Sequence, residues 1–233
     1  MQGCPKILER TTDTDFTKDY TMKGFIRGSV TILGALVCLC GAAPEPAVVP
    51  GPGVWTLGVR FEHPEQITLR AGPYEQPERF WYIILTLTNN TSRDVDFYPK
   101  CELMTDTFEI IPAGYRVPLA VFEQIKNRHK AKYPLLELLE DAGSKILQGV
   151  DNTKDVVVIW RDFDDKAKNI TLFLGGLSNE TAVFDHPVAK DEDGKPVKVF
   201  LRKTLELSYK LGGDPAFRYD VKPLFKENHW IMR

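Results

Sequence analysis

Acidic residues gather in one short stretch of the chain, and their types and spacing come closest to those of a metal site. Asp162, Asp164 and Asp165 are near neighbours, and Asp151 and Asp155 precede them. Hard cations such as Ca²⁺ bind several carboxylate and carbonyl oxygens on a bent loop. The stretch lacks the D-x-[DN]-x-[DN]-G spacing of a calcium loop. We therefore expect a solvated turn, without metal or cofactor.

Two other residues could act as nucleophiles, Cys101 and Ser178. Cys101 is the only cysteine downstream of residue 42, and a lone cysteine beside a strand is usually a small buried apolar residue. Ser178 follows a glycine pair, but no base can be assigned to it, so we expect a glycine-supported turn. The histidines lack the spacing of metal ligands or of a catalytic motif: His63, His129, His186 and His229. We therefore predict no catalytic residues.

Three further groups have both a structural and a functional interpretation. The charged run 190–196 contains Asp193-Gly194, which predicts a hairpin turn. Arg202-Lys203 interrupts an apolar strand, either as solvent-facing charge that discourages aggregation or as a contact for an anionic surface. The consecutive aromatic residues 80–82 cannot share one face of a strand. Packing in the core is favoured for them over a carbohydrate or peptide platform.

Most of the elements that would position these residues are strands. Alternating apolar residues predict them, and residues 80–88 (FWYIILTLT) indicate a central strand covered on both faces. The expected strands are residues 55–61, 67–70, 80–88, 95–98, 107–111, 156–160, 169–174, 197–209, 217–221 and 229–232.

A change of period predicts two helices between the strands, over residues 118–149. Leu119, Phe122 and Ile125 fall three residues apart after Pro118. After a second proline, Pro134, a further set follows at helical spacing and ends at a glycine: Leu135, Leu138, Leu139, Ala142, Ile146 and Gly149. The pattern therefore predicts a mostly β fold over residues 54–233, a two-layer antiparallel β-sandwich with immunoglobulin-like topology and a two-helix insertion.

The N-terminal part of the chain has the architecture of a bacterial export signal. Residues 22–42 contain Lys23 and Arg27, an uncharged apolar run (VTILGALVCLC) and a small-x-small cleavage site. The apolar run is too short to cross a membrane well, so we expect cleavage rather than a transmembrane span. Residues 1–21 are expected to be a leader from an overcalled start, and residues 43–53 a Pro/Gly-rich linker. An uncleaved anchor with a cytoplasmic tail is the alternative.

Charge excludes one class of function. The chain carries 30 Lys and Arg against 32 Asp and Glu, for a net charge of −2. Proteins that hold nucleic acid through phosphate contacts need a basic surface. We therefore expect no nucleic-acid partner.

The texture of the chain resembles uncharacterised exported β-sandwich proteins of planctomycete-type bacteria. The segments that carry the resemblance are WYIILTLTNNTSRDVDFYP, ILQGVDNTKD, LFLGGLSNET, FLRKTLELSY and WIMR, within residues 54–233. The resemblance implies an extracytoplasmic location, in the periplasm or cell envelope, and no established activity.

These observations favour a non-catalytic module that binds an envelope protein or polymer. The alternative is an extracytoplasmic hydrolase or metal-dependent enzyme built on the loops that carry Asp151, Asp155, Asp162 and Asp164. A third possibility is a structural component of an envelope assembly, which would expose an apolar patch. The alternatives differ in whether the four carboxylates converge on one cleft.

Overall fold

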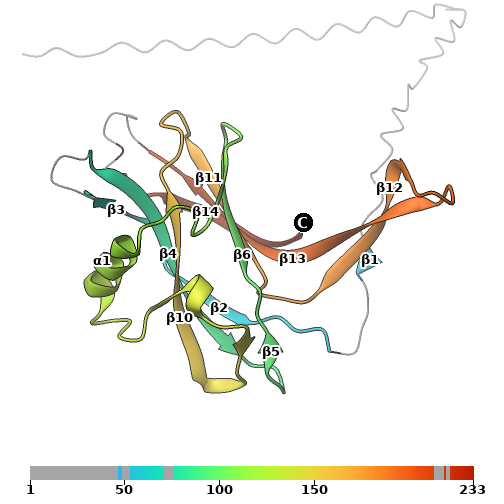
Figure 1. Ribbon diagram of the computed structural model, residues 1–233, viewed down its shortest axis with the longest axis horizontal. Helices are drawn as coiled ribbons and strands as arrows, with labels where there is room; N and C mark the ends of the chain where they lie inside the picture. Colours follow the sequence, from blue (N-terminus) through green and yellow to red (C-terminus); the bar gives the residue numbers. More distant parts are fainter. Residues whose placement is uncertain (1–46, 49–52, 71–75, 213–217, 219–220) are drawn as a thin grey trace, which may run out of the picture. The chain divides into compact units, whose positions relative to one another are not determined.

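The computed structural model of the chain describes residues 47–48, 53–70, 76–212, 218 and 221–233 (Figure 1). The expected leader (1–21), the export signal (22–42) and most of the expected linker (43–53) lie outside these residues, as does most of the expected strand 217–221. Among the described residues no helix is long and apolar enough to span a membrane.

The larger of two β-sheets is antiparallel throughout. Its strands follow the order β1 (Ala47–Val48), β12 (Thr181–Lys190), β13 (Pro196–Lys210), β11 (Asn169–Gly175), β6 (Lys100–Thr105) and β7 (Ile110–Pro112), and β14 (Leu224–Met232) pairs with β13.

The smaller sheet is built around two long central strands. Its order is β2 (Gly58–Phe61), β4 (Glu78–Asn89), β10 (Gly149–Arg161) and β8 (Glu137–Leu138), and β3 (Glu65–Leu69) also pairs with β4. Only β8 runs parallel to its neighbour. A separate short pair joins β5 (Val95–Asp96) to β9 (Lys145–Ile146).

Strand β4 is buried on both faces, as its sequence predicts. Trp81, Ile83, Leu85 and Leu87 enter the core that lies between the two sheets. The alternate residues enter a second core on the opposite face, under the helix: Phe80, Tyr82 and Ile84. The aromatic residues 80–82 are therefore core residues on both faces, and the mostly β, antiparallel fold is confirmed.

The first predicted helix is present as α1 (Leu119–His129), and it covers the outer face of the smaller sheet (Figure 1). Val121, Phe122 and Ile125 form its buried side, whereas Leu119 is 65% exposed, contrary to the spacing argument. Basic residues in the last turn of the helix favour its C-terminal dipole.

The second predicted helix is wrong, because α1 is the only α-helix in the described part of the chain. Residues 134–149 form β8, a single 3₁₀ turn (Leu139–Asp141) and β9. Leu139 and Ile146 are buried as expected, but Leu135 is 83% exposed. The stretch between Pro134 and Gly149 is near the length at which an isolated helix is only marginal in water. As strands, β8 and β9 pair with β10 and β5, and these tertiary contacts are not available to an isolated helix of this length.

Besides the two-residue strands β1, β8 and β9, two longer strands escaped the sequence pattern, β6 and β12. Strand β6 mixes charged residues with its buried Cys101 and Leu103, and β12 contains Pro187 and the polar Asp185. The hairpin turn at Asp193-Gly194 is confirmed, since Gly194 has a φ of +76° between β12 and β13.

Candidate functional site

Three neighbouring hollows surround the short segment that leads from β7 toward α1, residues 112–115. Their volumes are about 520, 450 and 490 Å³. Pro112 lines all three, Ala113 lines the first and third, and Tyr115 lines the second and third. Because they share these residues, the hollows lie next to one another around this segment, and together we call them the 112–115 groove.

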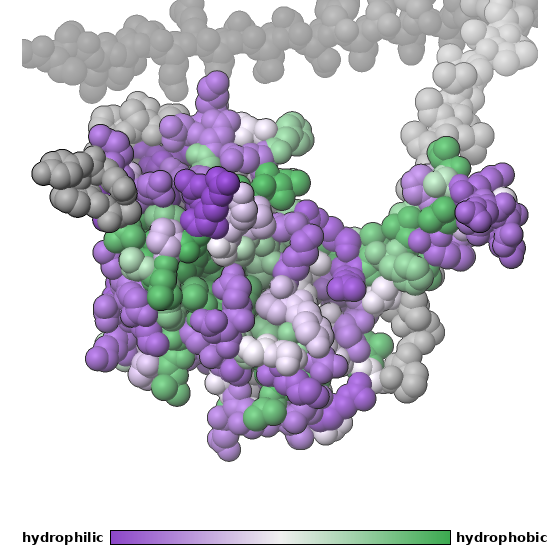
Figure 2. All heavy atoms as spheres, in the orientation of Figure 1, coloured by the Kyte–Doolittle hydropathy of each residue, from purple (hydrophilic) through white to green (hydrophobic). Residues whose placement is uncertain are grey.

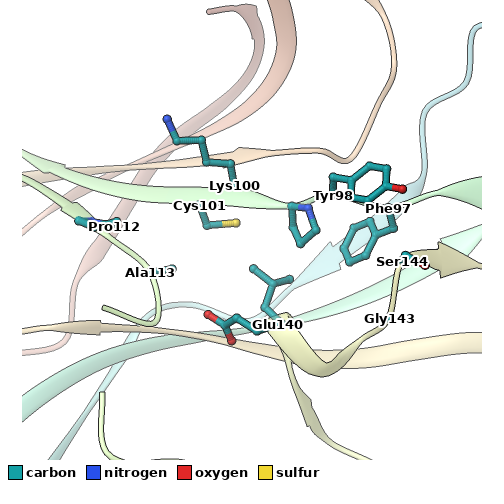
Figure 3. Close-up of a pocket in the computed structure, with 11 residues that line it drawn as sticks. Phe97, Tyr98, Lys100, Cys101, Pro112, Ala113, Glu140, Gly143 and Ser144 are labelled. Atoms are coloured by element: carbon teal, nitrogen blue, oxygen red, sulfur yellow. The ribbon is translucent and has the colours of Figure 1, made fainter. Parts of the chain in front are cut away.

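The first hollow lies between β6 and the 3₁₀ turn. Figure 3 shows the Cys101 thiol and the Glu140 carboxylate projecting into it from these two elements, with the rings of Phe97 and Tyr98 at one end. Glu140 also passes so close to the backbone of Gly114 that a Cβ at that position would collide with its carboxylate. The lining of the hollow is therefore mixed, since apolar groups lie beside the Glu140 carboxylate, Lys100 and Ser144.

The chemistry of Cys101 argues for a structural role. The side chain is buried, as its sequence context predicts, and burial raises the pKa of its thiol to about 12, with smaller contributions from the carboxylates of Glu140 and Glu102. A thiol is nucleophilic only as the thiolate. The residues that line this hollow include no histidine that could deprotonate Cys101. The first hollow can hold a ligand, but its thiol is not activated.

The second hollow is the most polar of the three, and it is framed by an ion pair. The Arg79 Nε–H donates to the Asp162 carboxylate at 2.9 Å, and the Trp81 indole N–H donates to the same carboxylate at 2.8 Å. Glu78, Glu109 and Arg161 add charges of both signs to the walls: Glu78 and Arg161 face each other at 3.7 Å. The walls therefore present no single sign of charge.

The third hollow is mainly apolar and lies where α1 meets the smaller sheet. Its lining includes Val117, Leu119, Phe122, Leu138 and Ile159. The loop that forms its rim is held in an unusual conformation: Arg116 has a φ of +53°, in the left-handed region that few non-glycine residues adopt. Such backbone strain persists only where the surrounding structure enforces it.

Large apolar side chains stand exposed around the groove. Tyr98 is 69% exposed, Ile110 52%, Tyr115 53% and Leu119 65%. A single exposed apolar residue is ordinary on a protein surface, whereas several exposed apolar residues around neighbouring hollows are typical of an interaction site. The arrangement suits binding through apolar contacts, guided by charges of both signs.

The structure does not bring the four carboxylates of the proposed enzyme site together. Asp162 and Asp164 follow the end of β10, whereas Asp151 lies near its beginning and Asp155 at its middle. Asp162 follows Asp155 by seven positions of extended chain, which corresponds to about 20 Å. Asp155 instead accepts a hydrogen bond from the Thr86 hydroxyl at 2.7 Å.

The acidic loop 162–168 is closed by an internal cation. The guanidinium of Arg218, only 3% exposed, donates to the main-chain oxygens of Asp164 (2.7 Å), Asp165 and Ala167 (2.6 Å). These are carbonyl oxygens of the kind that a calcium site would use. The Asp164 carboxylate accepts from the Lys166 amide at 2.9 Å, which lowers the pKa of Asp164. Within the described residues no group of three or more His, Cys, Asp or Glu side chains is arranged to hold a metal ion.

Ser178 is a structural residue, as its glycine-rich context predicts. Its side chain is nearly buried, and its hydroxyl donates to the main-chain oxygen of Trp55 at 2.7 Å. Gly176 has a φ of +84°, and a Cβ there would lie 2.5 Å from the carbonyl oxygen of Tyr98. This turn therefore joins the two sheets and supports the wall of the first hollow.

The histidines are dispersed, and two of them tie elements together. His129 at the end of α1 lies 2.8 Å from the Tyr82 hydroxyl, which also donates to Glu65 at 2.7 Å. His63 packs beside Tyr209 and Phe225, with ring centroids 5.9 and 5.4 Å away. The other two, His186 and His229, lie on β12 and β14.

Sequence reasoning missed the 112–115 groove, because its parts come from separate regions of the chain. The only local signal is the run PAGYRVP, residues 112–118, in which Tyr115 directly follows a glycine and the run begins and ends with proline. Such a run predicts a loop, but it does not reveal that β6, the 3₁₀ turn and α1 surround it.

Comparison with known proteins adds no assignment at this point: neither protein-family models, nor curated proteins, nor solved structures gave a match to this chain.

Proposed function

We propose that this chain is a non-catalytic binding module of the periplasm or cell envelope, and that its 112–115 groove holds a segment of another envelope protein. The extracytoplasmic location rests on the export-signal architecture of residues 22–42 and on the resemblance to exported bacterial proteins. The immunoglobulin-like topology of the two packed sheets belongs to the same proposal.

The observation that carries the proposal is the set of exposed apolar side chains around three neighbouring hollows. A polypeptide segment presents apolar side chains together with charges of either sign. The groove matches that mixture, since Tyr115 and Leu119 are exposed beside walls that carry Arg161 and Glu109. A uniformly charged polymer would call for walls of one sign, as in other sites that select by charge.

The same geometry gives no support to the competing hydrolase or metalloenzyme. Its carboxylates are spread along β10 and the loop that follows it, and the loop carbonyls near Asp164 already accept hydrogen bonds from Arg218. The thiol in the groove has a raised pKa. A binding role needs none of these groups to be activated.

Selection of displayed peptides tests the proposal even while the partner is unidentified. The purified protein is used to select binders from a phage-displayed library of random peptides. The groove variant Tyr115→Ser/Leu119→Ser should weaken the selected peptides about tenfold or more, which corresponds to about 1.4 kcal/mol.

The matched control is Val150→Ser/Leu224→Ser, which removes apolar side chains of similar exposure (72% and 66%) that do not line the groove. Equal melting temperatures would show that all three proteins are folded. Failure to enrich any peptide, or peptides that bind the groove variant as tightly as the unsubstituted protein, would count against the proposal.

A further inference from the structure

A two-stranded ribbon extends from the larger sheet, formed by β12 and the first half of β13. Figure 1 shows it reaching away from the strands that surround the core, and Figure 2 shows hydrophobic side chains along it, below a hydrophilic tip. Residues 196–202 of β13 pair with β12, whereas the pairing of β13 with β11 begins at Leu205. None of residues 183–203 belongs to either core, so among the described residues no second layer buries this part of the sheet.

The ribbon exposes more apolar surface than a free hairpin should. Phe200 is 67% exposed, Val188 81% and Val197 37%. An isolated two-stranded hairpin is at best marginally stable in water. Exposed hydrophobic strands of this kind are sites where another chain pairs.

The edge of the ribbon that belongs to β12 is protected. The short strand β1 pairs with Val183 and Ala182. Further along, Pro187 cannot donate a backbone hydrogen bond, and the register with β13 shifts between Asp185 and Lys190. These are the usual devices that keep an edge strand from pairing.

The opposite edge of the ribbon, formed by β13, has no such protection. The Arg202 amide donates to Arg233 at 2.8 Å and its carbonyl accepts from Arg233 at 3.1 Å, while the Lys203 amide points the other way, to Glu180 near β12. Since backbone groups alternate along a strand, Phe200 and Lys198 direct their N–H and C=O groups to the same side as Arg202. No described strand pairs with them there.

We propose that this free edge, residues 197–201 of β13, binds an extended segment of another protein as an added antiparallel strand in line with β14. Val197, Val199 and Leu201 share one face of the ribbon, and Lys198 and Phe200 share the other. The segment that fits has apolar residues opposite these apolar side chains and an acidic residue opposite Lys198, whose ammonium already pairs with Asp185 of β12 and would be shared between the two carboxylates. This mode is β-strand addition, in which main-chain bonds give affinity and alternate side chains give selectivity.

A second copy of this chain fits the edge less well. Symmetric pairing would place Lys198 of each copy opposite Phe200 of the other. In that register residue 195 of the second copy would lie opposite Lys203, a position that Met232 of β14 already occupies. The turn of the second hairpin would therefore collide with β14. A separate extended segment has no such turn.

A patterned peptide tests the proposal directly on the whole protein. The probe is the fluorescent peptide VFIEVTEGS, whose first residue would lie opposite Leu201, next to the position that Arg233 occupies, and whose first glutamate would lie opposite Lys198. It is compared with the same residues in scrambled order. We expect the patterned peptide to bind at least about tenfold more tightly by fluorescence anisotropy. Binding should also slow hydrogen exchange at the Lys198 and Phe200 amides.

Charge reversal supplies the sharpest control. Lys198→Glu should weaken the patterned peptide about three- to tenfold, and the peptide with lysine in place of that first glutamate should regain the loss. Phe200→Pro should abolish binding, since it removes an outward N–H that the pairing with β12 does not use. The groove variant Tyr115→Ser/Leu119→Ser should bind the peptide normally, which separates this proposal from the groove.

The proposal is overturned if the scrambled peptide binds equally well, or if Lys198→Glu leaves the preference unchanged. It is also overturned if light scattering shows a dimer of the unsubstituted protein that Phe200→Pro converts to a monomer, because the occupant would then be a second copy.

Discussion

Strand β4 and the first half of β13 are both rich in apolar residues but have opposite surroundings. Residues 80–85 of β4 form a continuous apolar run, residues 197–201 of β13 are apolar except for Lys198, and both segments contain phenylalanine and β-branched residues. In β4 the side chains enter two cores, whereas the apolar residues of β13 between Val197 and Leu201 remain partly or largely open to solvent. The same pattern therefore stabilises the fold in one strand and offers a surface in the other.

The difference arises from what covers each strand. Strand β4 lies between β2 and β10 in its sheet, with the larger sheet on one face and α1 on the other. Residues 197–201 of β13 pair, among the described strands, with β12 alone. Periodicity reports that a strand could be buried, but the long-range pairings decide whether it is.

A matched pair of phenylalanine substitutions tests whether the two strands differ in burial. Phe80 is 1% exposed and Phe200 is 67% exposed. Phe80→Ala should lower the free energy of unfolding by about 3–5 kcal/mol, through lost burial and a residual cavity. Phe200→Ala should change it by about 0.5 kcal/mol or less.

Urea denaturation of both variants measures the difference. A large loss for Phe200→Ala would mean that the ribbon is packed against something in the isolated protein, and the proposed free edge would have to be abandoned.

Sequence reasoning succeeded where burial and period coincide. The strand over residues 80–88 could be predicted because its residues are apolar on both faces, and α1 because Pro118 precedes a set of residues at helical spacing. It failed at residues 134–149, where leucines three or four apart also fit short strands around a 3₁₀ turn. Local spacing cannot distinguish these outcomes, because the deciding contacts are with β10 and β5.

The candidate site was less accessible than the fold. Cys101 and Ser178 could be recognised as structural from their own neighbours. The 112–115 groove could not be predicted. It depends on β6, which the sequence pattern did not reveal, and on Glu140 lying beside Gly114, which is far from it in the chain. The paired role of Asp162 also depends on Arg79, which lies on a different strand.

Two glycines extend the comparison to turns, one beside the first hollow and one at the turn between β12 and β13. Gly176 and Gly194 both have positive φ, +84° and +76°, so alanine is strained at either position. A Cβ at Gly176 would in addition lie 2.5 Å from the carbonyl oxygen of Tyr98, whereas nothing lies within 4 Å of a Cβ at Gly194. Gly176→Ala should therefore cost about 1–3 kcal/mol more than Gly194→Ala. Equal losses in thermal denaturation would show that the turn beside the first hollow adjusts freely.

Two ion pairs extend the comparison to charged groups. The pair of Arg79 and Asp162 is mostly shielded, with side-chain exposures of 18% and 28%, whereas Lys198 and Asp185 on the ribbon are 60% and 53% exposed. Asp162→Asn should lower the free energy of unfolding by about 1.5–3 kcal/mol, since it weakens charge-assisted hydrogen bonds from Arg79 and Trp81. Asp185→Asn should cost less than about 0.5 kcal/mol. Chemical denaturation at low and high salt measures both; a salt-sensitive loss of equal size in the two variants would contradict the assignment.

The smallest expected effect concerns Cys101 and appears only at alkaline pH. Burial raises the pKa of its thiol to about 12 in the folded protein, whereas an unfolded cysteine ionises near pH 8.5. The unfolded state therefore releases a proton that the folded state retains, so the stability from this group is complete below about pH 8.5 and declines as the pH rises toward 12. The expected loss is about 1–2 kcal/mol at pH 10. Tyr82 and Tyr209 also have pKa values raised by burial, and they add to the decline only above about pH 10.

Cys101→Ala isolates the contribution of the thiol, because it keeps both tyrosines. Between pH 8 and 9.5 the stability of the unsubstituted protein should fall with pH, and that of Cys101→Ala should remain nearly flat. Thiol labelling of the folded protein should also be slow and become fast in denaturant, since only the thiolate reacts. Parallel pH profiles for the two proteins, or rapid labelling under native conditions, would mean that the Cys101 thiol is exposed to solvent. In solvent exposure, this wall of the groove would then resemble the ribbon and not the buried strand β4.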